Sequence, residues 1–210
     1  GDAKANLMQE GIRAGSIVVT GNTVIDSLLV ASGWRVHFTD AHLQQVVASD
    51  RKIILVTTHR RENLSAMQSI GAAVHTLGRK FPEALFVLPL HPNPEVRGAV
   101  LPEVGDLENV CVTDPLPYDQ FTSLMAKSHI VLTDSGGVQE EAPSLGKPVL
   151  VMRDNTERPE ALKAGTVELV GTEHDRIVMA TSNLIEQPTL YERMANAVNP
   201  YGDGRAAQRV

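Results

Sequence analysis

Three small residues open a predicted helix directly after an apolar run. Ser135, Gly136 and Gly137 follow Ile130–Thr133, and Glu141 lies about one helical turn further along. Glycines let the backbone turn tightly and approach a ligand, and the free N–H groups at a helix start favour a phosphate. A carboxylate beside such a start suits the paired hydroxyls of a ribose. The alternative is a capped helix start whose glycines serve packing alone.

Cationic and titratable side chains follow two further apolar runs. His59, Arg60 and Arg61 come directly after Ile53–Val56, and such groups are costly to bury without an anion or a carboxylate. An imidazole there could donate a hydrogen bond to a phosphate or shuttle a proton. His91 lies among prolines that hold its loop stiff. The alternatives are a solvated loop with an internal Arg–Glu pair and a structural histidine.

Two arginines follow a fourth apolar run. Arg153 comes directly after Val149–Met152, and Arg158 precedes a short predicted helix that begins at Pro159. The planar guanidinium group offers a fork of donors that could clamp an anionic ligand. Helix capping combined with a surface ion pair is the alternative.

The elements that position these residues alternate along the chain. We expect strands at Ile17–Thr20, Ile53–Thr57, Leu85–Leu88, Asn109–Thr113, Ile130–Thr133, Pro148–Met152 and Val167–Val170. Helical patterns lie at Ala3–Gln9, Met67–Arg79, Tyr118–Ala126, Val138–Leu145 and Asp175–Glu186, and residues 33–49 form a longer, less regular insertion. Continuous apolar runs that alternate with helices predict an α/β fold with a Rossmann-like, doubly wound parallel sheet. Ligands bind outside the carboxyl ends of such strands, so the four polar junctions should meet at one edge.

Composition narrows the classes of partner. The chain has 210 residues and a net charge of −6, which disfavours nucleic acid as a ligand. Cys111 is the single cysteine, which excludes a disulfide framework and fits a reducing compartment. No signal peptide opens the chain and no apolar run is long enough to span a bilayer. We therefore expect a cytoplasmic protein with no membrane partner.

Motifs that the sequence lacks restrict the ligand further. It contains no Gly-x-Gly-x-x-Gly, no Walker A pattern and no metal-ligand cluster. Redox dinucleotides and ATP are disfavoured for this reason, and no metal is expected. A phosphate cradle, a carboxylate suited to ribose and several cations at one sheet edge favour a nucleotide or a nucleotide sugar.

The motifs resemble those of the non-hydrolysing UDP-N-acetylglucosamine 2-epimerases. The resemblance runs in order along essentially the whole chain, and its most specific part is the block at residues 133–160. The matching segments are Gly21–Asp26, His59–Asn63, His91–Pro94, Thr133–Leu150, Arg153–Glu160 and Asn199–Gly204. The resemblance implies one half of a glycosyltransferase-B (GT-B) architecture, with an active site between two Rossmann-like domains.

The resemblance also implies a division of the chain into segments. Residues 1–20 would end the N-terminal domain and cross over, residues 21–198 would form the C-terminal UDP-binding domain, and residues 199–210 would start a C-terminal crossover helix. The N-terminal catalytic domain would be missing, together with the carboxylates expected to handle the C2 proton. By itself the chain is expected to bind without turnover.

The implied reaction inverts C2 of the sugar and gives UDP-N-acetylmannosamine by elimination and re-addition of UDP, without a cofactor. The resemblance assigns the diphosphate to Ser135, Gly136 and Gly137, and the ribose to Glu141. It places uracil against Phe121, with the backbone near Leu116 reading the edge of the base. Arg158 would contact the phosphate or the sugar. His59, the implied catalytic residue, would help the UDP leaving group to bear its charge.

Further expectations from the resemblance concern regulation and assembly. Arg60 and His91 would help to bind a second, activating UDP-GlcNAc, and the full-length parent would be a homodimer. A glycosyltransferase or a hydrolysing epimerase of the same architecture is a rival enzyme, because a shared fold does not separate them. A UDP-sugar-binding fragment without catalysis is the rival from another class.

Overall fold

A computed structural model describes residues 2–210, which form a six-stranded parallel sheet in the order β3-β2-β1-β4-β5-β6. The strands are β1 (Ile53–Thr57), β2 (Leu85–Pro89), β3 (Val110–Thr113), β4 (Ile130–Thr133), β5 (Val149–Val151) and β6 (Val167–Leu169). The strand order reverses direction between β1 and β4, which pair from Ile54 with Ile130 to Thr57 with Thr133. This order confirms the doubly wound fold and places its switch point between β1 and β4.

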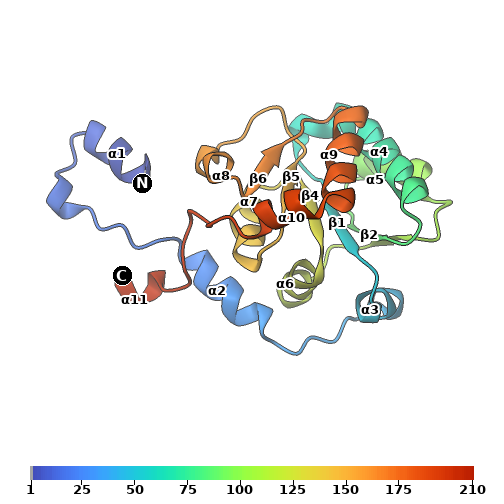
Figure 1. The fold of residues 1–210 in the computed structure, drawn as a ribbon, viewed down its shortest axis with the longest axis horizontal. Helices are drawn as coiled ribbons and strands as arrows, with labels where there is room; N and C mark the ends of the chain where they lie inside the picture. Colours follow the sequence, from blue (N-terminus) through green and yellow to red (C-terminus); the bar gives the residue numbers. More distant parts are fainter. Residues whose placement is uncertain (1) are drawn as a thin grey trace.

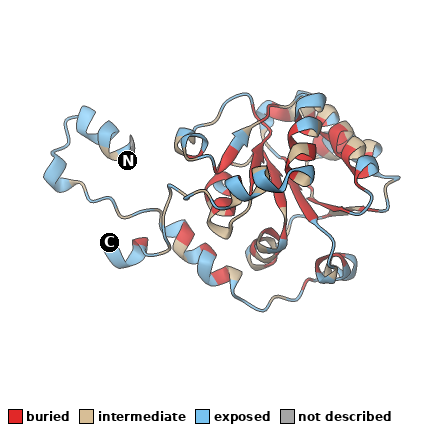
Figure 2. Ribbon diagram, in the orientation of Figure 1, coloured by how far each residue is buried: buried red, intermediate tan, exposed pale blue. Residues whose placement is uncertain are grey.

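Helices cover both faces of the sheet (Figure 1). On one face lie α4 (Met67–Lys80), α5 (Pro94–Val104), α9 (His174–Glu186) and α10 (Pro188–Ala195). On the other lie α2 (Thr23–Ser32), α3 (Ala41–Ala48), α6 (Tyr118–Lys127), α7 (Gly136–Glu141) and α8 (Pro159–Ala164). Alternate strand residues serve the two layers: Ile54 and Val56 pack on the first, and Ile53 and Leu55 on the second. The central strands β1 and β4 are accordingly buried along both faces (Figure 2).

Two expectations for the first fifty residues were wrong. Ile17–Thr20 is not a strand: Val18 is 73 % and Val19 60 % exposed, and no strand of residues 2–210 pairs with the segment. An apolar, β-branched run becomes a strand only where a neighbouring strand satisfies its backbone. Residues 33–49 contain the helix α3, which begins because the Asp40 carboxylate accepts a hydrogen bond from the Leu43 N–H.

The segments at the two ends of the sheet domain run together. The N–H of Asn22 donates to the Tyr201 carbonyl at 2.7 Å, and Arg209 donates to the Thr20 carbonyl at 3.1 Å. The carboxylate of Asp26 on α2 accepts the backbone N–H groups that open α11 (Ala206–Arg209). Together with α1 (Asp2–Gln9) and the 3₁₀ turn Ala14–Ser16, these segments project from the side of the sheet domain (Figure 1).

A pair of threonine hydroxyls joins β1 to β4 at their carboxyl ends. The Oγ1 atoms of Thr57 and Thr133 are 2.6 Å apart and buried. The Thr133 hydroxyl also accepts a hydrogen bond from the Ser135 N–H at 3.0 Å, where the chain leaves β4 for α7. This hydroxyl therefore fixes how the turn at the switch point leaves the sheet.

Replacing Thr133 with valine should destabilise the fold by about 1–3 kcal/mol, because the Ser135 N–H and the Thr57 hydroxyl lose their buried partner. Thr181→Val is the matched control, since the Thr181 hydroxyl is buried without a hydrogen-bond partner among the described residues. Its removal should be neutral or stabilising. Urea unfolding measures both variants, and equal losses of stability would contradict the role given to Thr133.

Candidate functional site

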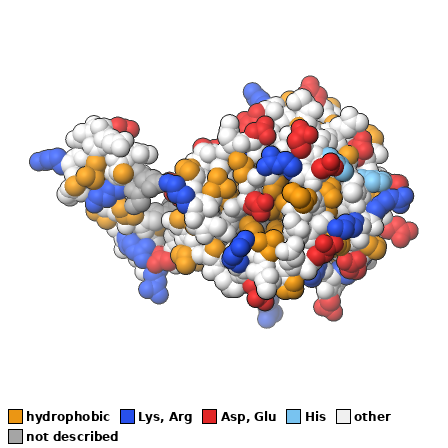
Figure 3. All heavy atoms as spheres, turned by 45° about the horizontal axis from the view of Figure 1, so that its top comes forward, with side chains coloured by type: hydrophobic (Ala, Val, Ile, Leu, Met, Phe, Trp, Pro, Cys, Tyr) orange, Lys and Arg blue, Asp and Glu red, His pale blue; other side chains and the backbone are white. Residues whose placement is uncertain are grey.

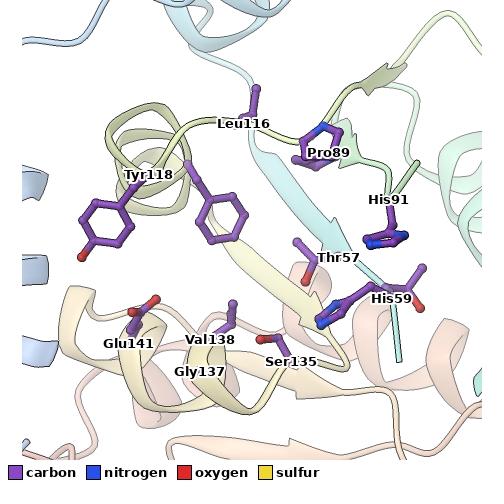
Figure 4. Close-up of a pocket in the computed structure, with 13 residues that line it drawn as sticks. Thr57, His59, Pro89, His91, Leu116, Tyr118, Ser135, Gly137, Val138 and Glu141 are labelled. Atoms are coloured by element: carbon purple, nitrogen blue, oxygen red, sulfur yellow. The ribbon is translucent and has the colours of Figure 1, made fainter. Parts of the chain in front are cut away.

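A hollow of about 340 Å³ opens at the carboxyl ends of β1, β2 and β4 (Figure 4). It lies at the switch point of the sheet, where ligands of this fold class bind. Its walls come from three loops and two helices, α6 and α7. The lining residues are Thr57, Thr58, His59, Pro89, His91, Pro115, Leu116, Tyr118, Phe121, Ser135, Gly137, Val138 and Glu141.

The first turn of α7 forms the floor of the hollow. Ser135 is the N-cap residue, but its hydroxyl makes no capping hydrogen bond and lies at the hollow. A Cβ atom built on Gly137 would have only the Ser135 Oγ nearby, at 3.9 Å, so the space beside Gly137 is open. A Cβ atom on Gly136 would instead meet Arg60 Nη2 and Glu157 Oε1 at 3.2 Å. The two glycines thus serve different purposes, because Gly137 faces the hollow and Gly136 lies under an ion pair.

One wall of the hollow is apolar and ends in a carboxylate. Leu116 and Phe121 pack partly into the core on the α6 side of the sheet, and both border the hollow. Glu141 closes this wall from the end of α7 (Figure 4). Burial, and to a lesser extent the neighbouring Glu140, raise the pKa of Glu141 above its usual value. An apolar wall beside an acceptor fits a flat base joined to a sugar with free hydroxyls.

The opposite wall is built on Asp134, which the sequence analysis did not single out. Its carboxylate is fully buried and accepts the backbone N–H groups of His59 and Arg60, at 3.0 and 2.9 Å, from the loop after β1. Thr58 Oγ1 and Asn63 Nδ2 also donate to it. Burial alone would raise the pKa of Asp134, but the hydrogen bonds from His59 and Arg60 outweigh it and lower this pKa. A polar residue at the buried end of β4 was the available signal.

A second hollow of about 570 Å³ adjoins the first and shares His59 and His91 with it. Arg60, Arg61, Glu62 and Asn93 complete its lining. The Arg60 guanidinium pairs with Glu157 at 3.4 Å, and its Nε is buried without a hydrogen-bond partner among residues 2–210. The structure thus brings Arg60 and His91, the two residues expected at a second ligand, to one place.

The two arginines after β5 do not line the first hollow. Arg153 is buried and pairs with Glu62 at 2.8 Å and with Glu157 at 2.7 Å, whereas the alternative to an anion clamp was a surface ion pair. Arg158 pairs with Glu140, which also accepts a hydrogen bond from Asn22 at 2.5 Å. A contact of Arg158 with a ligand remains a prediction, and its present partner is a carboxylate of the protein.

Basic and acidic side chains are interspersed on the face shown in Figure 3, without a broad basic area there. Residues 2–210 contain no cluster of three or more side chains suited to hold a metal ion. None of the described helices is long and apolar enough to cross a membrane.

Comparison with known proteins places the chain in a family. The family model for UDP-N-acetylglucosamine 2-epimerase matches residues 1–210. The UDP-N-acetylglucosamine 2-epimerase of Neisseria meningitidis is 48 % identical over 214 residues, which cover 100 % of this chain and 58 % of that protein. The chain thus spans little more than half the length of this relative.

Solved structures agree with this placement. A Neisseria meningitidis UDP-GlcNAc 2-epimerase bound to UDP-GlcNAc is similar to this chain with a TM-score of 0.88 and 46 % identity, over 99 % of this chain and 57 % of that one. A Staphylococcus aureus MnaA–UDP co-structure gives 0.90 and 40 %, over 99 % and 56 %. The C-terminal domain of a Francisella tularensis group 1 glycosyl transferase shares the fold alone, with a TM-score of 0.54 and 15 % identity over 78 % of this chain and 91 % of that one. The chain is one half of a GT-B architecture, and it belongs to the UDP-N-acetylglucosamine 2-epimerase family.

Proposed function

We propose that this chain is the UDP-binding half of a non-hydrolysing epimerase that interconverts UDP-N-acetylglucosamine and UDP-N-acetylmannosamine. The observation that carries the proposal is the hollow at the β1–β4 switch point. It combines an open helix start at Gly137, a carboxylate at Glu141 and an apolar wall at Phe121. These three features match the diphosphate, the ribose and the base of one ligand.

The order of the parts along the hollow gives the orientation of UDP. The Ser135 hydroxyl and the backbone N–H group of Gly137 receive the diphosphate, because both residues line the hollow where α7 opens and the Ser135 hydroxyl makes no capping hydrogen bond. Glu141 lies at the other end of the same helix and accepts hydrogen bonds from the ribose hydroxyls. Uracil then packs against Phe121, and the backbone near Leu116 reads its edge. Gly136 contributes by letting the Arg60–Glu157 pair pack on the helix start.

His59 is the residue that we assign to chemistry within this chain. Elimination of UDP leaves a 2-acetamidoglucal and develops negative charge on the diphosphate. After the glycal is reprotonated, UDP is added again and its diphosphate loses that charge. An imidazole at the diphosphate stabilises that charge. Tight binding of UDP keeps both fragments in place between the two steps. Glu141 is the one carboxylate that lines the hollow within the described residues, and we assign it to ribose. The groups that handle the C2 proton are therefore assigned to the remainder of the parent.

The proposed division of the chain into segments is the one that the resemblance to the epimerases implies. Residues 1–20, of which Gly1 lies outside the described part, belong to the N-terminal domain and the crossover. Residues 21–198 form the UDP-binding domain, and residues 199–210 start the returning helix. The exposed Val18 and Val19 and the contact between Asn22 and Tyr201 support this division. A homodimer of the cytoplasmic parent remains a prediction from the resemblance.

The second hollow supports a second ligand site. Arg60 and His91 line it together, and Arg61 adds a further cation beside them. We assign it to an activating UDP-GlcNAc. Because both hollows share His59 and His91, a ligand in one hollow would change the affinity of the other hollow for its ligand.

Gly137→Ala should leave the fold at least as stable, because alanine favours a helix over glycine and the site has room for a methyl group. The methyl group would occupy the place of the diphosphate, so UDP affinity should fall by about tenfold or more, corresponding to at least about 1.4 kcal/mol. Thermal unfolding and calorimetric titration measure the two effects. Unchanged affinity in the stable variant would remove the diphosphate from this helix start.

Glu141→Ala should weaken UDP binding about tenfold by removing the ribose acceptor, while circular dichroism remains that of the parent chain. The sharper readout compares UDP with its 2′,3′-dideoxy analogue. The unsubstituted chain should prefer UDP, and the variant should bind both ligands equally. A variant that keeps the preference would place the ribose elsewhere.

Incubation of this chain with UDP-GlcNAc should give binding without formation of UDP-ManNAc, because the groups assigned to the C2 proton lie elsewhere in the parent. Nuclear magnetic resonance of the sugar anomeric protons follows the conversion. Formation of UDP-ManNAc would show that the chain suffices for catalysis. Release of free N-acetylmannosamine would instead favour a hydrolysing epimerase. If the full-length parent also forms no product, the protein is a UDP-sugar-binding protein without catalysis.

A further inference from the structure

The side-chain ring of His59 contacts the carboxylate of Asp134, a residue that lines neither of the two hollows. The His59 Nδ1 lies 3.2 Å from Asp134 Oδ1, and Asp134 is fully buried while the His59 side chain is 44 % exposed. A carboxylate that is ionised can only accept hydrogen bonds. The proton of this contact therefore belongs to His59 Nδ1, and the Nε2 edge of the ring is left for the hollow.

The neighbouring imidazole, that of His91, accepts a hydrogen bond at Nδ1, whereas the His59 Nδ1 carries a proton. His91 Nδ1 accepts a hydrogen bond from the Asn93 N–H at 3.2 Å, so the proton of its neutral ring is on Nε2. The two rings are stacked, with centroids 6.2 Å apart and planes 26° apart, and both border the same hollow (Figure 4). A second proton on His91 would break its contact with Asn93, whereas a second proton on His59 would not disturb Asp134.

We propose that Asp134 is a positioning residue that makes His59, and not His91, the doubly protonated imidazole that contacts the diphosphate. The proposal rests on the proposed binding of UDP. Phosphate oxygens accept hydrogen bonds, so the Nε2 of His59 must carry a proton in that contact, while Nδ1 keeps the proton shared with Asp134. Binding of UDP to a chain with a neutral His59 therefore takes up one proton from solvent. This link between Asp134 and His59 goes beyond the assignment of His59 to the diphosphate.

Other charged groups around His59 do not replace Asp134 in this role. The Arg60 guanidinium is turned to Glu157, and Glu62 pairs with Arg153. Asp134 is the carboxylate that contacts the His59 ring among residues 2–210. The titratable and charged groups that line the two hollows with His59 are His91, Tyr118, Glu141, Arg60, Arg61 and Glu62. Asp134 also holds the backbone of residues 59 and 60, so it fixes both the position and the tautomer of His59.

The tautomers can be observed directly in the chain labelled with ¹⁵N, by long-range proton–nitrogen correlation spectra of the histidine rings. His59→Asn and His91→Asn assign the two sets of signals. Without ligand at a pH where His59 is neutral, we expect its proton on Nδ1 and that of His91 on Nε2. Saturation with UDP should protonate both nitrogens of His59 and leave His91 neutral. A His59 ring with its proton on Nε2 and a bare Nδ1 would overturn the proposal, whether or not UDP binds.

Substitution separates positioning from general stability. Asp134→Asn should lower UDP affinity about tenfold or more and change uridine affinity less than about twofold, because only the diphosphate contact depends on the His59 cation. Asn63→Ala is the matched control, because Asn63 donates to Asp134 and to the Met152 carbonyl without touching the ring. It should lower the melting temperature and keep both the tautomer of His59 and the ratio of UDP to uridine affinity.

Equal losses for UDP and uridine in Asp134→Asn, or the same change of ratio in Asn63→Ala, would reduce Asp134 to a structural role. Failure of the unsubstituted chain to bind either nucleotide would count against the proposed function. In that case the tautomer of the free His59 ring still decides the role of Asp134, because it is measured without ligand and without a substitution at Asp134.

Discussion

The parallel pairing of β1 with β4 is the constraint on which the candidate site depends. This pairing, from Ile54 with Ile130 to Thr57 with Thr133, brings a loop with basic side chains next to a loop with a carboxylate. The loop after β1 carries His59 and Arg60, and the loop after β4 carries Asp134 and the helix start at Gly137. One buried carboxylate then ties the first loop to the second through backbone hydrogen bonds. A register shift of one residue would turn these groups to the other face.

The helix α7 distributes its side chains between structure and ligand. Glu141 faces the hollow, whereas the adjacent Glu140 is buried and holds Arg158 and Asn22. Neighbouring residues on a helix point about 100° apart, so one short helix serves both purposes. Asn22 belongs to the segment that runs beside Tyr201, which means that the hollow and these two end segments contact the same helix.

The sequence predicted the sheet better than the details of the site. All six strands of the sheet were expected, because strands covered on both faces read as short, largely apolar runs. The helix α5 was missed because Pro92 and Pro94 obscured a start that the Asn93 side chain caps, and because Pro102 lies inside the helix. The strand expected at Ile17–Thr20 failed because a strand needs a neighbour that residues 2–210 do not provide.

Residues that line the hollow were predictable where a motif places them after a strand, as for Ser135, His59 and His91. Their partners were not predictable, because pairing depends on the side chain's direction in three dimensions. The sequence could not show that Arg153 and Arg158 turn to carboxylates of the protein. Asp134 was overlooked because a buried aspartate within a strand–turn motif looks like part of the turn. Only the hydrogen bonds to its carboxylate show that Asp134 fixes the backbone of His59 and Arg60.

Calorimetric titration of UDP into this chain, with GDP as the control, tests the central claim most directly. If the hollow is a complete nucleotide half-site, UDP binds and GDP binds at least about tenfold more weakly, because we assign the wall of Leu116 and Phe121 to uracil and a purine is larger. Equal binding of both nucleotides, or of neither, would contradict the claim that the hollow at the β1–β4 switch point recognises UDP.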